Sequence, residues 1–227
     1  MRRRDGVWAV VPIKELTLAK QRLAKAVPPR HRAGLAAAMA SDVLETLSAV
    51  QGLAGIVVVT VDAQATAIAR EFGAVVADDS ARDGHTAVVA AAASRLAREG
   101  CRAMLTLPGD IPTLAAAEVE HLLQGVANGP SVTLVPSRDG DGTNAALCSP
   151  PTALAFAFGP GSFERHVGLV RRQGLEPRIV RSSGIGLDID TPEDLRLLAS
   201  HAADTRSRRY CREHLADVVS LVPGSAQ

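Results

Sequence analysis

The sequence has little aromatic character: its 227 residues include four phenylalanines, one tyrosine and one tryptophan. It also lacks an excess of charge of either sign, because 25 lysines and arginines face 24 aspartates and glutamates. A balanced charge creates no overall field that would draw nucleic acid or an acidic membrane surface, so we expect neither as a partner. Any phosphate must be held by local groups. The 47% of hydrophobic residues predicts a globular core of alanine, valine and leucine.

Long hydrophobic runs and paired cysteine motifs are lacking as well. Behind the basic start, Met1–Arg4, the apolar run covers only Val7–Val11 before a proline. This run is too short for the core of a signal peptide or for a membrane span, so we expect a cytoplasmic protein. The three cysteines are odd in number and share no C-x-x-C spacing, which favours reduced thiols and no zinc site.

Two common catalytic signatures are missing. The sequence contains no G-x-x-x-x-G-K-[ST], which excludes a P-loop. The sequence shows neither a Ser-His-Asp order nor a Cys-His pair, so it gives no indication of nucleophilic catalysis. The candidates for chemistry are therefore carboxylates, cations and loops rich in glycine and hydroxyl groups.

Strand-like and helix-like segments alternate along the chain. Strands are predicted at Val7–Val11, Ile56–Val61, Ala74–Ala77, Ala103–Leu107, Ser131–Pro136 and Leu175–Val180. Several of them lack polar alternation, which is typical of a parallel sheet covered on both faces. The order predicts one α/β domain with a mainly parallel sheet flanked by helices and a small antiparallel excursion between about Ser131 and Ala157. We expect residues 1–205 to form this domain and residues 206–227 to be an Arg-rich C-terminal tail or terminal helix.

The stretch Leu105–Pro112 ends a buried strand in a tight turn that presents Asp110. Pro108 and Gly109 stop the strand at its carboxyl end, where open α/β sheets usually bind their ligands. Two interpretations of Asp110 stay open at this point. It is either a functional carboxylate or a cap for the helix that starts near Ala115.

The loop after the first strand, Pro12–Lys25, carries several cations, among them Lys14, Lys20 and Arg22. In an α/β protein this loop lies over the ligand crevice, so the cations suggest a clamp for a polyphosphate. A solvated surface charge run is the alternative, and the spacing does not decide between the two.

A third polar segment, Asp78–Thr86, precedes a helix rich in alanine and valine. Its Gly84 leaves backbone N–H groups free at a helix N-terminus, a usual place for a nucleotide base or phosphate. Ordinary capping by Asp83 or Thr86 explains the segment better when it is taken alone. His85 has no visible acid or nucleophile partner and is not predicted to be catalytic.

Two later loops are rich in glycine and hydroxyl groups. The turn-rich segment Ser137–Asn144 either carries Thr143 into a site or simply closes a hairpin. Gly159 and Ser162 precede a predicted helix, where backbone N–H groups and a hydroxyl suit a small phosphate or carboxylate. A simple N-cap at Ser162 is the alternative.

The segment Leu187–Leu195 combines a D-x-D with a clear helix start at Thr191. In an extended D-x-D the two carboxylates point to opposite faces, so we expect only Asp190 to face the site. Asp194 is expected to stabilise the helix N-terminus. Asp110 and Asp190 together are the ligand set that Mg²⁺ prefers beside phosphate oxygens, which predicts a magnesium-held nucleoside triphosphate and a second, phosphorylated substrate.

Five blocks of the sequence, taken in order, carry a family resemblance. They are Val11–Lys14 with Ala19–Leu23, Leu107–Pro112, Asp141–Leu147, Phe158–His166 and Leu187–Leu195. Together they resemble the guanylyltransferases of coenzyme F420 biosynthesis, which include the 2-phospho-L-lactate and phosphoenolpyruvate guanylyltransferases. The resemblance spans about Val7–Leu198, nearly the whole chain.

The resemblance implies a single-domain nucleotidyltransferase fold of the GT-A-like, Rossmann-like kind, similar to that of molybdenum-cofactor guanylyltransferase. It implies transfer of GMP from GTP to the phosphate of a small phosphorylated carboxylic acid, with release of pyrophosphate and with Mg²⁺ as cofactor. Phosphoenolpyruvate is the favoured acid, and 2-phospho-L-lactate and 3-phosphoglycerate are the alternatives. A homodimer is compatible with these expectations.

The resemblance also implies roles for individual residues. Asp110 and Lys20 are catalytic, and Asp110 and Asp190 hold the metal. The nucleotide is bound by Lys14, Lys20, Arg22, Thr86, Pro108 and Gly109. The acid is bound by Thr143, Gly159 and Ser162. One block departs from the family, which often has Gly-Leu-Asn where this chain has Gly84-His85-Thr86, and Thr86 cannot reproduce the two-ended amide of Asn.

Two rival functions stay open. A related nucleotidyltransferase with the same fold would use another nucleoside triphosphate, such as CTP, or an acceptor of the sugar-phosphate or molybdenum-cofactor type. A noncatalytic nucleotide-binding regulator would also share the fold. The presence of both carboxylates and of the cationic loop argues against the regulator.

Overall fold

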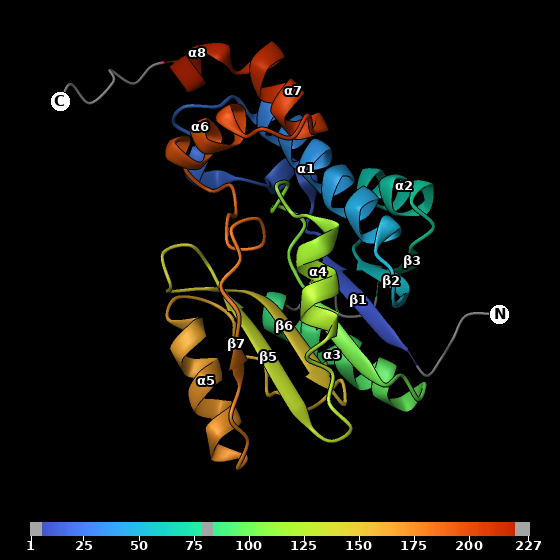
Figure 1. Cartoon of the computed structure of the whole chain (residues 1–227). Helices are drawn as coiled ribbons and strands as arrows, with labels where there is room; N and C mark the ends of the chain where they lie inside the picture. The colour runs from blue at the N-terminus through green and yellow to red at the C-terminus, as the bar shows by residue number, and fades with distance from the viewer. Residues whose placement is uncertain (1–5, 79–83, 221–227) are drawn as a thin grey trace.

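The computed structural model describes residues 6–78 and 84–220 (Figure 1). The basic start Met1–Arg4, Asp83 with its predicted capping role and residues 221–227 of the predicted tail lie outside the described residues.

One sheet of seven strands runs through the molecule in the order β3-β2-β1-β4-β6-β5-β7. The strands are β1 (Val7–Pro12), β2 (Leu53–Val59), β3 (Val75–Ala77), β4 (Ala103–Thr106), β5 (Ser131–Pro136), β6 (Thr143–Ser149) and β7 (Arg178–Ile179). The first four strands pair in parallel, β6 runs antiparallel to both β4 and β5, and β7 is parallel to β5. This arrangement confirms the predicted α/β fold with a mainly parallel sheet and a small antiparallel excursion.

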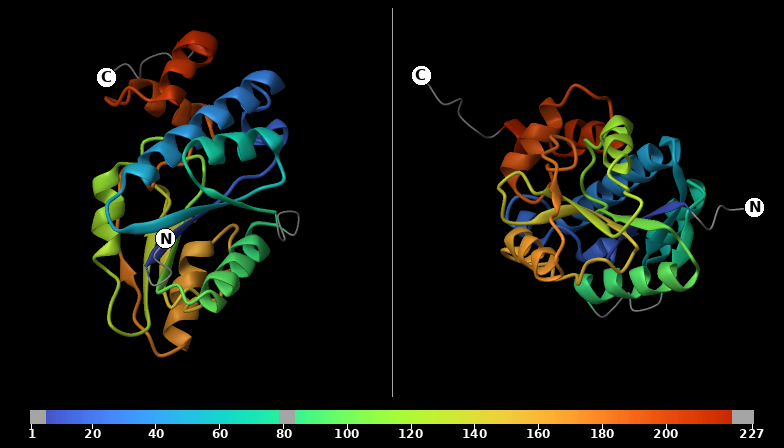
Figure 2. Two further views of the ribbon diagram at one scale, coloured as in Figure 1. Left: turned by 90° about the vertical axis from the view of Figure 1, so that its right-hand side faces the viewer. Right: turned by 60° about the horizontal axis from the view of Figure 1, so that its bottom comes forward.

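Helices cover both faces of this sheet (Figures 1 and 2). They are α1 (Pro29–Ala49), α2 (Ala63–Glu71), α3 (His85–Arg98), α4 (Ala116–Leu123), α5 (Ser162–Arg172), α6 (Pro192–Ser200), α7 (Arg206–His214) and α8 (Ala216–Ser220), with short 3-10 turns at Leu16–Leu18 and Gln21–Leu23. Buried side chains of α1, α2, α4, α6 and α7 join one core, whereas those of α3 and α5 join a second core on the opposite face.

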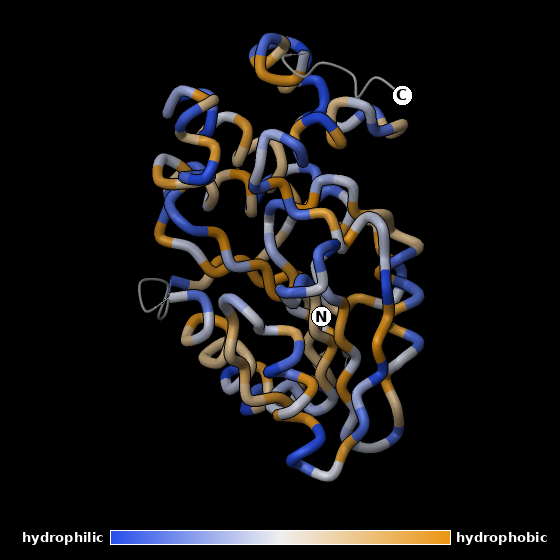
Figure 3. The backbone as a smooth tube through the Cα atoms, turned by 90° about the vertical axis from the view of Figure 1, so that its left-hand side faces the viewer, coloured by the Kyte–Doolittle hydropathy of each residue, from blue (hydrophilic) through white to orange (hydrophobic). Residues whose placement is uncertain are grey.

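Strand β1 shows why the central runs are apolar without interruption. Val7, Ala9 and Val11 belong to the first core, and Trp8 and Val10 belong to the second. A strand with a core on each face needs hydrophobic residues at every position, as the sequence pattern predicted. Figure 3 shows hydrophobic stretches along the interior strands, whereas many peripheral turns are hydrophilic.

One predicted strand is much shorter than expected. We predicted Leu175–Val180, but β7 contains only Arg178 and Ile179. The N–H of Leu175 donates to Val170 O at 3.3 Å, so this residue is bonded to the end of α5 and not to a strand. Pro177 has no N–H and therefore cannot donate a hydrogen bond to a neighbouring strand.

Helix α7, the last but one of the described chain, packs against α1 and α6 at one end of the molecule (Figure 1). Cys211 of α7 and Leu215 behind it are buried in the first core. Within the described residues, no helix combines the length and the apolar character needed to cross a membrane.

Candidate active site

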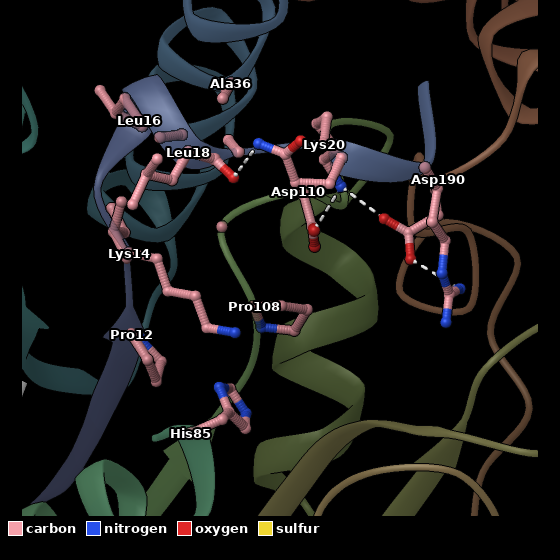
Figure 4. Close-up of a pocket in the computed structure, with 16 residues that line it drawn as sticks. Pro12, Lys14, Leu16, Leu18, Lys20, Ala36, His85, Pro108, Asp110 and Asp190 are labelled. Carbon is pink, nitrogen blue, oxygen red and sulfur yellow. Dashed lines mark hydrogen bonds and ion pairs between the residues drawn. The ribbon is translucent and has the colours of Figure 1, made fainter. Parts of the chain in front are cut away.

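Two adjoining cavities open at the carboxyl ends of β1 and β4, the edge at which a parallel sheet usually binds its ligand. The larger cavity, about 440 Å³, is lined by the loop after β1 and by the turn after β4 (Figure 4). The smaller cavity, about 150 Å³, is lined by the start of β6 and by Asp188. His85, Pro108 and Asp110 line both, so they form the shared wall.

Lys20 holds the two predicted metal ligands together. Its Nζ lies 2.5 Å from Asp110 Oδ2 and 2.9 Å from Asp190 Oδ1, and its side chain is 5% exposed. Burial by itself would lower the pKa of Lys20, but the two carboxylates outweigh burial and hold the pKa above its usual value. The structure thus places a permanent positive charge between two acidic loops that are far apart in the sequence.

Arg22 and Lys14 add positive charge to the larger cavity. Arg22 Nη1 lies 3.1 Å from Asp190 Oδ2, but its side chain is 75% exposed, so this ion pair contributes little to stability. Among the described residues no carboxylate pairs with Lys14, and its ammonium group points into the cavity (Figure 4). Three cations around one cavity favour the polyphosphate clamp over a plain surface charge run.

A buried arginine of α1 braces the loop that carries Lys20. Arg32 Nη1 donates to Val27 O at 3.0 Å, and Arg32 Nε donates to Ala19 O at 3.3 Å. Arg32 is 6% exposed, so these hydrogen bonds also satisfy a charge that would otherwise be costly to bury. Sequence reasoning missed Arg32, because a single arginine within a helix forms no recognisable motif.

The Asp110 turn does not cap the next helix. α4 begins after Ala115, whose N–H donates instead to Glu118 Oε2 at 3.0 Å. The Asp110 carbonyl accepts a hydrogen bond of 3.1 Å from the N–H of Ile189, which joins the two acidic loops through their backbones. The structure therefore excludes the capping interpretation and brings the Asp110 carboxylate beside Asp190.

Asp188, which we expected to point away from the site, lines the smaller cavity. Its Oδ1 accepts a hydrogen bond of 3.1 Å from Asn144 Nδ2. Burial raises the pKa of Asp188, and the negative charges of Asp110 and Asp190 add to the increase against the lowering effect of the Asn144 hydrogen bond. The D-x-D lies outside any strand, so the alternation on which our expectation rested does not apply there.

The Asp110 and Asp190 pair fits a magnesium ion by its donor chemistry. Asp110 Oδ1 is buried without a hydrogen-bond partner, although Oδ2 of the same carboxylate contacts Lys20. A buried carboxylate oxygen without a partner is costly unless a cation or water satisfies it. Carboxylate oxygens are the protein ligands that magnesium prefers, and one or two of them suffice when phosphates bind as well. Within the described residues, no cluster of three or more His, Cys, Asp or Glu side chains is arranged to hold a metal.

The predicted acid-binding residues meet where β6 and α5 begin. Thr143 lines the smaller cavity, whereas Gly159 and Ser162 line neither cavity. Ser162 is buried behind Thr143, and its Oγ accepts a hydrogen bond of 3.0 Å from Thr143 N. The Ser162 N–H in turn donates to Gly159 O at 3.0 Å. Gly159 has φ 122°, a backbone conformation that other residues rarely adopt.

The segment at Gly84 brings His85 to the cavities, whereas Thr86 contacts the rest of the protein. Thr86 Oγ1 accepts the N–H of Phe158 at 3.0 Å and lines neither cavity. His85 packs edge-on against Phe158, with ring centroids 4.5 Å apart. Burial and the charge of Lys14 lower the pKa of His85, against the raising effect of Asp110. Sequence reasoning set His85 aside because its neighbours come from other loops.

Comparison with known proteins agrees with the geometry. A sequence model described as guanylyl transferase CofC like matches residues 7–225. A phosphoenolpyruvate guanylyltransferase from Rubrobacter xylanophilus is 39% identical over 205 residues, which are 90% of this chain and 99% of that protein. A 2-phospho-L-lactate guanylyltransferase from Methanothermobacter thermautotrophicus is 30% identical over 205 residues, 90% of this chain and 89% of that protein.

Solved structures share the fold at lower identity. A protein assigned as a nucleotide-diphospho-sugar transferase from Desulfovibrio desulfuricans superposes with a TM-score of 0.77 at 17% identity, covering 95% of this chain and 98% of that one. A nucleotidyl transferase from Methanothermobacter thermautotrophicus superposes with a TM-score of 0.57 at 18% identity, covering 85% of this chain and 95% of that one. At such identities the likeness extends to the fold alone.

Proposed function

The chain belongs to the CofC-like guanylyl transferase family, and from this premise we propose that it transfers GMP from GTP to the phosphate of phosphoenolpyruvate, with release of pyrophosphate, in coenzyme F420 biosynthesis. The observation that carries the proposal is the ammonium of Lys20 between Asp110 and Asp190, at the edge of two adjoining cavities. This arrangement suits two anionic substrates that must meet.

The larger cavity is the proposed site of GTP. Its volume of about 440 Å³ is within the usual range for small-molecule sites, and its lining includes five of the predicted nucleotide-binding residues, Lys14, Lys20, Arg22, Pro108 and Gly109. Thr86, the sixth, has one lone pair of its hydroxyl engaged by Phe158 N–H and lines neither cavity, so it is not included in the proposed GTP contacts.

The smaller cavity is the proposed site of the phosphorylated acid. Its volume of about 150 Å³ suits a three-carbon acid better than a nucleotide, and Thr143 and Asp188 line it. Asp110 lines both cavities, so its carboxylate would lie beside the place where the acid phosphate meets the triphosphate. A magnesium ion held by Asp110 and Asp190 would neutralise phosphate charge at this place.

The reaction is an in-line displacement. A phosphate oxygen of the acid forms a bond to the α-phosphorus of GTP, and the bond from the α-phosphorus to the bridging oxygen of the β-phosphate breaks, so that pyrophosphate leaves with the electron pair. An ionised phosphate nucleophile needs no general base, and none is invoked. The work of the protein is to position the substrates and to stabilise charge, through Lys20 above all.

The choice of acid depends on small differences. Phosphoenolpyruvate, 2-phospho-L-lactate and 3-phosphoglycerate differ by a double bond or a hydroxyl, which a pocket separates by shape and by paired polar groups. Phosphoenolpyruvate is proposed because relatives with that name are the more similar of those compared.

The test is a competition of the three acids with GTP and magnesium, with mass analysis of the product and measurement of released pyrophosphate. Asp110→Asn should lower turnover by at least about 100-fold in a protein that stays folded, because it removes charge from the centre of the site. Glu176→Gln is the matched control, since it removes an exposed carboxylate whose one ion-pair partner among the described residues is Arg171.

Each other outcome has a clear meaning. Normal turnover of Asp110→Asn would contradict the proposed site. Product with CTP but not with GTP would indicate the related nucleotidyltransferase. GTP binding without release of pyrophosphate in the presence of any of the three acids would indicate the noncatalytic regulator.

A further inference from the structure

A buried histidine stands behind the wall of the smaller cavity and takes no part in the mechanism above. His166, on α5, is fully buried. Its Nε2 lies 2.9 Å from the backbone N of Ala157, and its Nδ1 lies 2.9 Å from Thr143 Oγ1. One imidazole therefore joins the loop before α5 to the first residue of β6.

These contacts fix the tautomer of the ring. A backbone N–H can only donate, so Nε2 must be the acceptor in the contact with Ala157 and carries no proton. Burial, helped by the charge of Arg165, lowers the pKa of His166 to about 4, so the ring is neutral at neutral pH. A neutral imidazole has one N–H, which must be at Nδ1 and must donate to Thr143 Oγ1.

The tautomer decides what Thr143 offers to the cavity. A threonine hydroxyl has one hydrogen and two lone pairs, and one lone pair is used by His166. The hydroxyl hydrogen cannot point back at the Nδ1–H, and the described residues offer Oγ1 no second hydrogen-bond partner. Thr143 lines the smaller cavity, so a hydrogen-bond donor remains for a ligand there.

Aromatic packing holds the imidazole in this orientation. The rings of Phe158 and Phe156 stand nearly perpendicular to it, with centroids 5.0 Å and 6.4 Å away. The two phenylalanines themselves stack almost in parallel, 6° apart. A ring flip of His166 would place carbon atoms where Nε2 and Nδ1 now lie, and both hydrogen bonds would be lost, so the observed orientation is the one that satisfies both contacts.

We propose that His166 is a positioning residue that fixes the Thr143 hydroxyl as a hydrogen-bond donor to an anionic oxygen of the phosphorylated acid. The inference rests on the proposed function for the identity of that ligand. If His166 were absent, the hydroxyl would rotate freely and would have to be ordered as a donor each time the anion binds. The inference extends the site from Thr143 to a residue that never touches substrate.

The tautomer is tested directly on the whole chain by nitrogen-15 NMR of the histidine rings at pH 7. A neutral ring with its proton on Nδ1 is expected for His166. A proton on Nε2, or a charged ring, overturns the proposal. This readout needs no turnover and no ligand.

The positioning role is tested by a double-mutant cycle with Thr143→Val, which removes the hydroxyl. Thr143→Val should raise the KM for phosphoenolpyruvate by about 10- to 100-fold, the value of one hydrogen bond to a charged group. His166→Phe keeps the hydroxyl but frees its rotation, so it should raise this KM by a smaller factor, and both variants should leave the KM for GTP nearly unchanged. The double variant should be no worse than Thr143→Val, because His166 acts only through that hydroxyl. His166→Asn, which can return an N–H near the Nδ1 position, should recover part of the loss.

Effects that multiply in the double variant, or an equal rise in the KM for GTP, overturn the proposal in favour of a merely structural role. Calorimetric binding of phosphoenolpyruvate gives the same comparison without turnover. If the wild-type protein shows no turnover, but binding of this acid to the single and double variants is non-additive as expected, the proposed reaction fails and the inference about His166 stands. Melting temperatures show which variants are folded. If no variant folds, the NMR measurement of the His166 tautomer in the wild-type protein still tests the proposal.

Discussion

Lys20 combines a strained backbone with a buried charge. Its φ of 55° lies in the left-handed region, and it is the one non-glycine residue with positive φ among the residues described. That conformation costs an ordinary residue about 1–2 kcal/mol, so it persists only where the surroundings enforce it. Here the two carboxylates hold the ammonium in place. Strain at a residue that bridges two acidic loops is consistent with the catalytic role predicted for Lys20.

We predict that Lys20→Met lowers turnover by at least about 100-fold and lowers the free energy of unfolding by about 1–3 kcal/mol. The loss of stability arises because two partly exposed carboxylates then face each other without a cation. Magnesium should restore more stability to the variant than to wild type, since it can replace the ammonium. Melting temperatures with and without magnesium measure this, and equal gains in both proteins would contradict it.

His166 should make stability sensitive to acid. Its pKa is about 4 in the folded protein and near 6.5 in the unfolded chain, so between these values the unfolded chain binds a proton that the folded protein does not. The neutral His166 ring therefore contributes stability that is fully present above pH 6.5 and is lost progressively as the pH falls to about 4. Melting curves over this range should fall more steeply for wild type than for His166→Phe, and parallel curves would speak against a buried neutral imidazole.

At the scale of the element, the start of α6 positions one carboxylate of the site. Thr191 Oγ1 accepts the N–H of Asp194 at 3.3 Å, and Asp194 Oδ2 accepts the N–H of Thr191 at 2.8 Å, which confirms the predicted helix start. Asp194 Oδ2 also accepts the N–H of Asp190 at 3.2 Å. Arg138 completes the cluster with a contact of 2.8 Å to Asp194 Oδ1. The helix cap therefore also fixes the backbone of Asp190.

Asp194→Ala should lower the free energy of unfolding by about 1–3 kcal/mol, because a cap is lost and backbone donors are left without partners. It should also lower kcat/KM by about tenfold through the displaced Asp190. Glu193→Ala is the control, since Glu193 lies in the same turn but is exposed, and within the part of the chain that the structure describes it pairs with Arg196 alone. Chemical denaturation and initial rates measure the two effects. A wild-type rate in the destabilised Asp194→Ala variant would show that the cap stabilises the fold without positioning Asp190.

At the scale of the whole molecule, a buried aspartate fastens the C-terminal helix to the domain. Asp42 of α1 is 5% exposed and accepts hydrogen bonds from the N–H of Arg206 at 2.8 Å, from the N–H of Ser207 at 2.9 Å and from Ser207 Oγ at 2.6 Å. Residues 206–214 therefore form a helix, α7, that is packed against the rest of the chain.

Asp42→Ala should lower the free energy of unfolding by about 3 kcal/mol and the melting temperature by roughly 5–10 °C, because several buried donors lose their partner. Glu45→Ala, one turn away, is the control. Glu45 is exposed and pairs with Arg206 at the surface, so its loss should cost less than about 1 kcal/mol. Similar melting temperatures for the two variants would show that α7 is not held through Asp42.

Much of the fold followed from local pattern. Strand-helix alternation and apolar runs without polar positions predicted a covered, mainly parallel sheet, and the capping residues predicted where α6 begins. Predictions from residue patterns were wrong where the backbone is irregular. The predicted strand at β7 is only two residues long, and Asp188 lies in a loop, where side chains do not alternate between two faces.

The sequence by itself indicated that the loops after β1 and β4, which carry Lys20 and Asp110, would open on the same edge of the sheet, because the carboxyl ends of neighbouring parallel strands meet there. For Asp190 and Thr143 it offered a place in the site as a prediction. Only the tertiary structure decided that an ammonium bridges the two carboxylates, that Asp188 enters the smaller cavity, and that His166 stands behind Thr143. Hydrogen bonds between residues distant in sequence depend on how helices and loops pack, and these individual contacts produce no periodic pattern in the sequence.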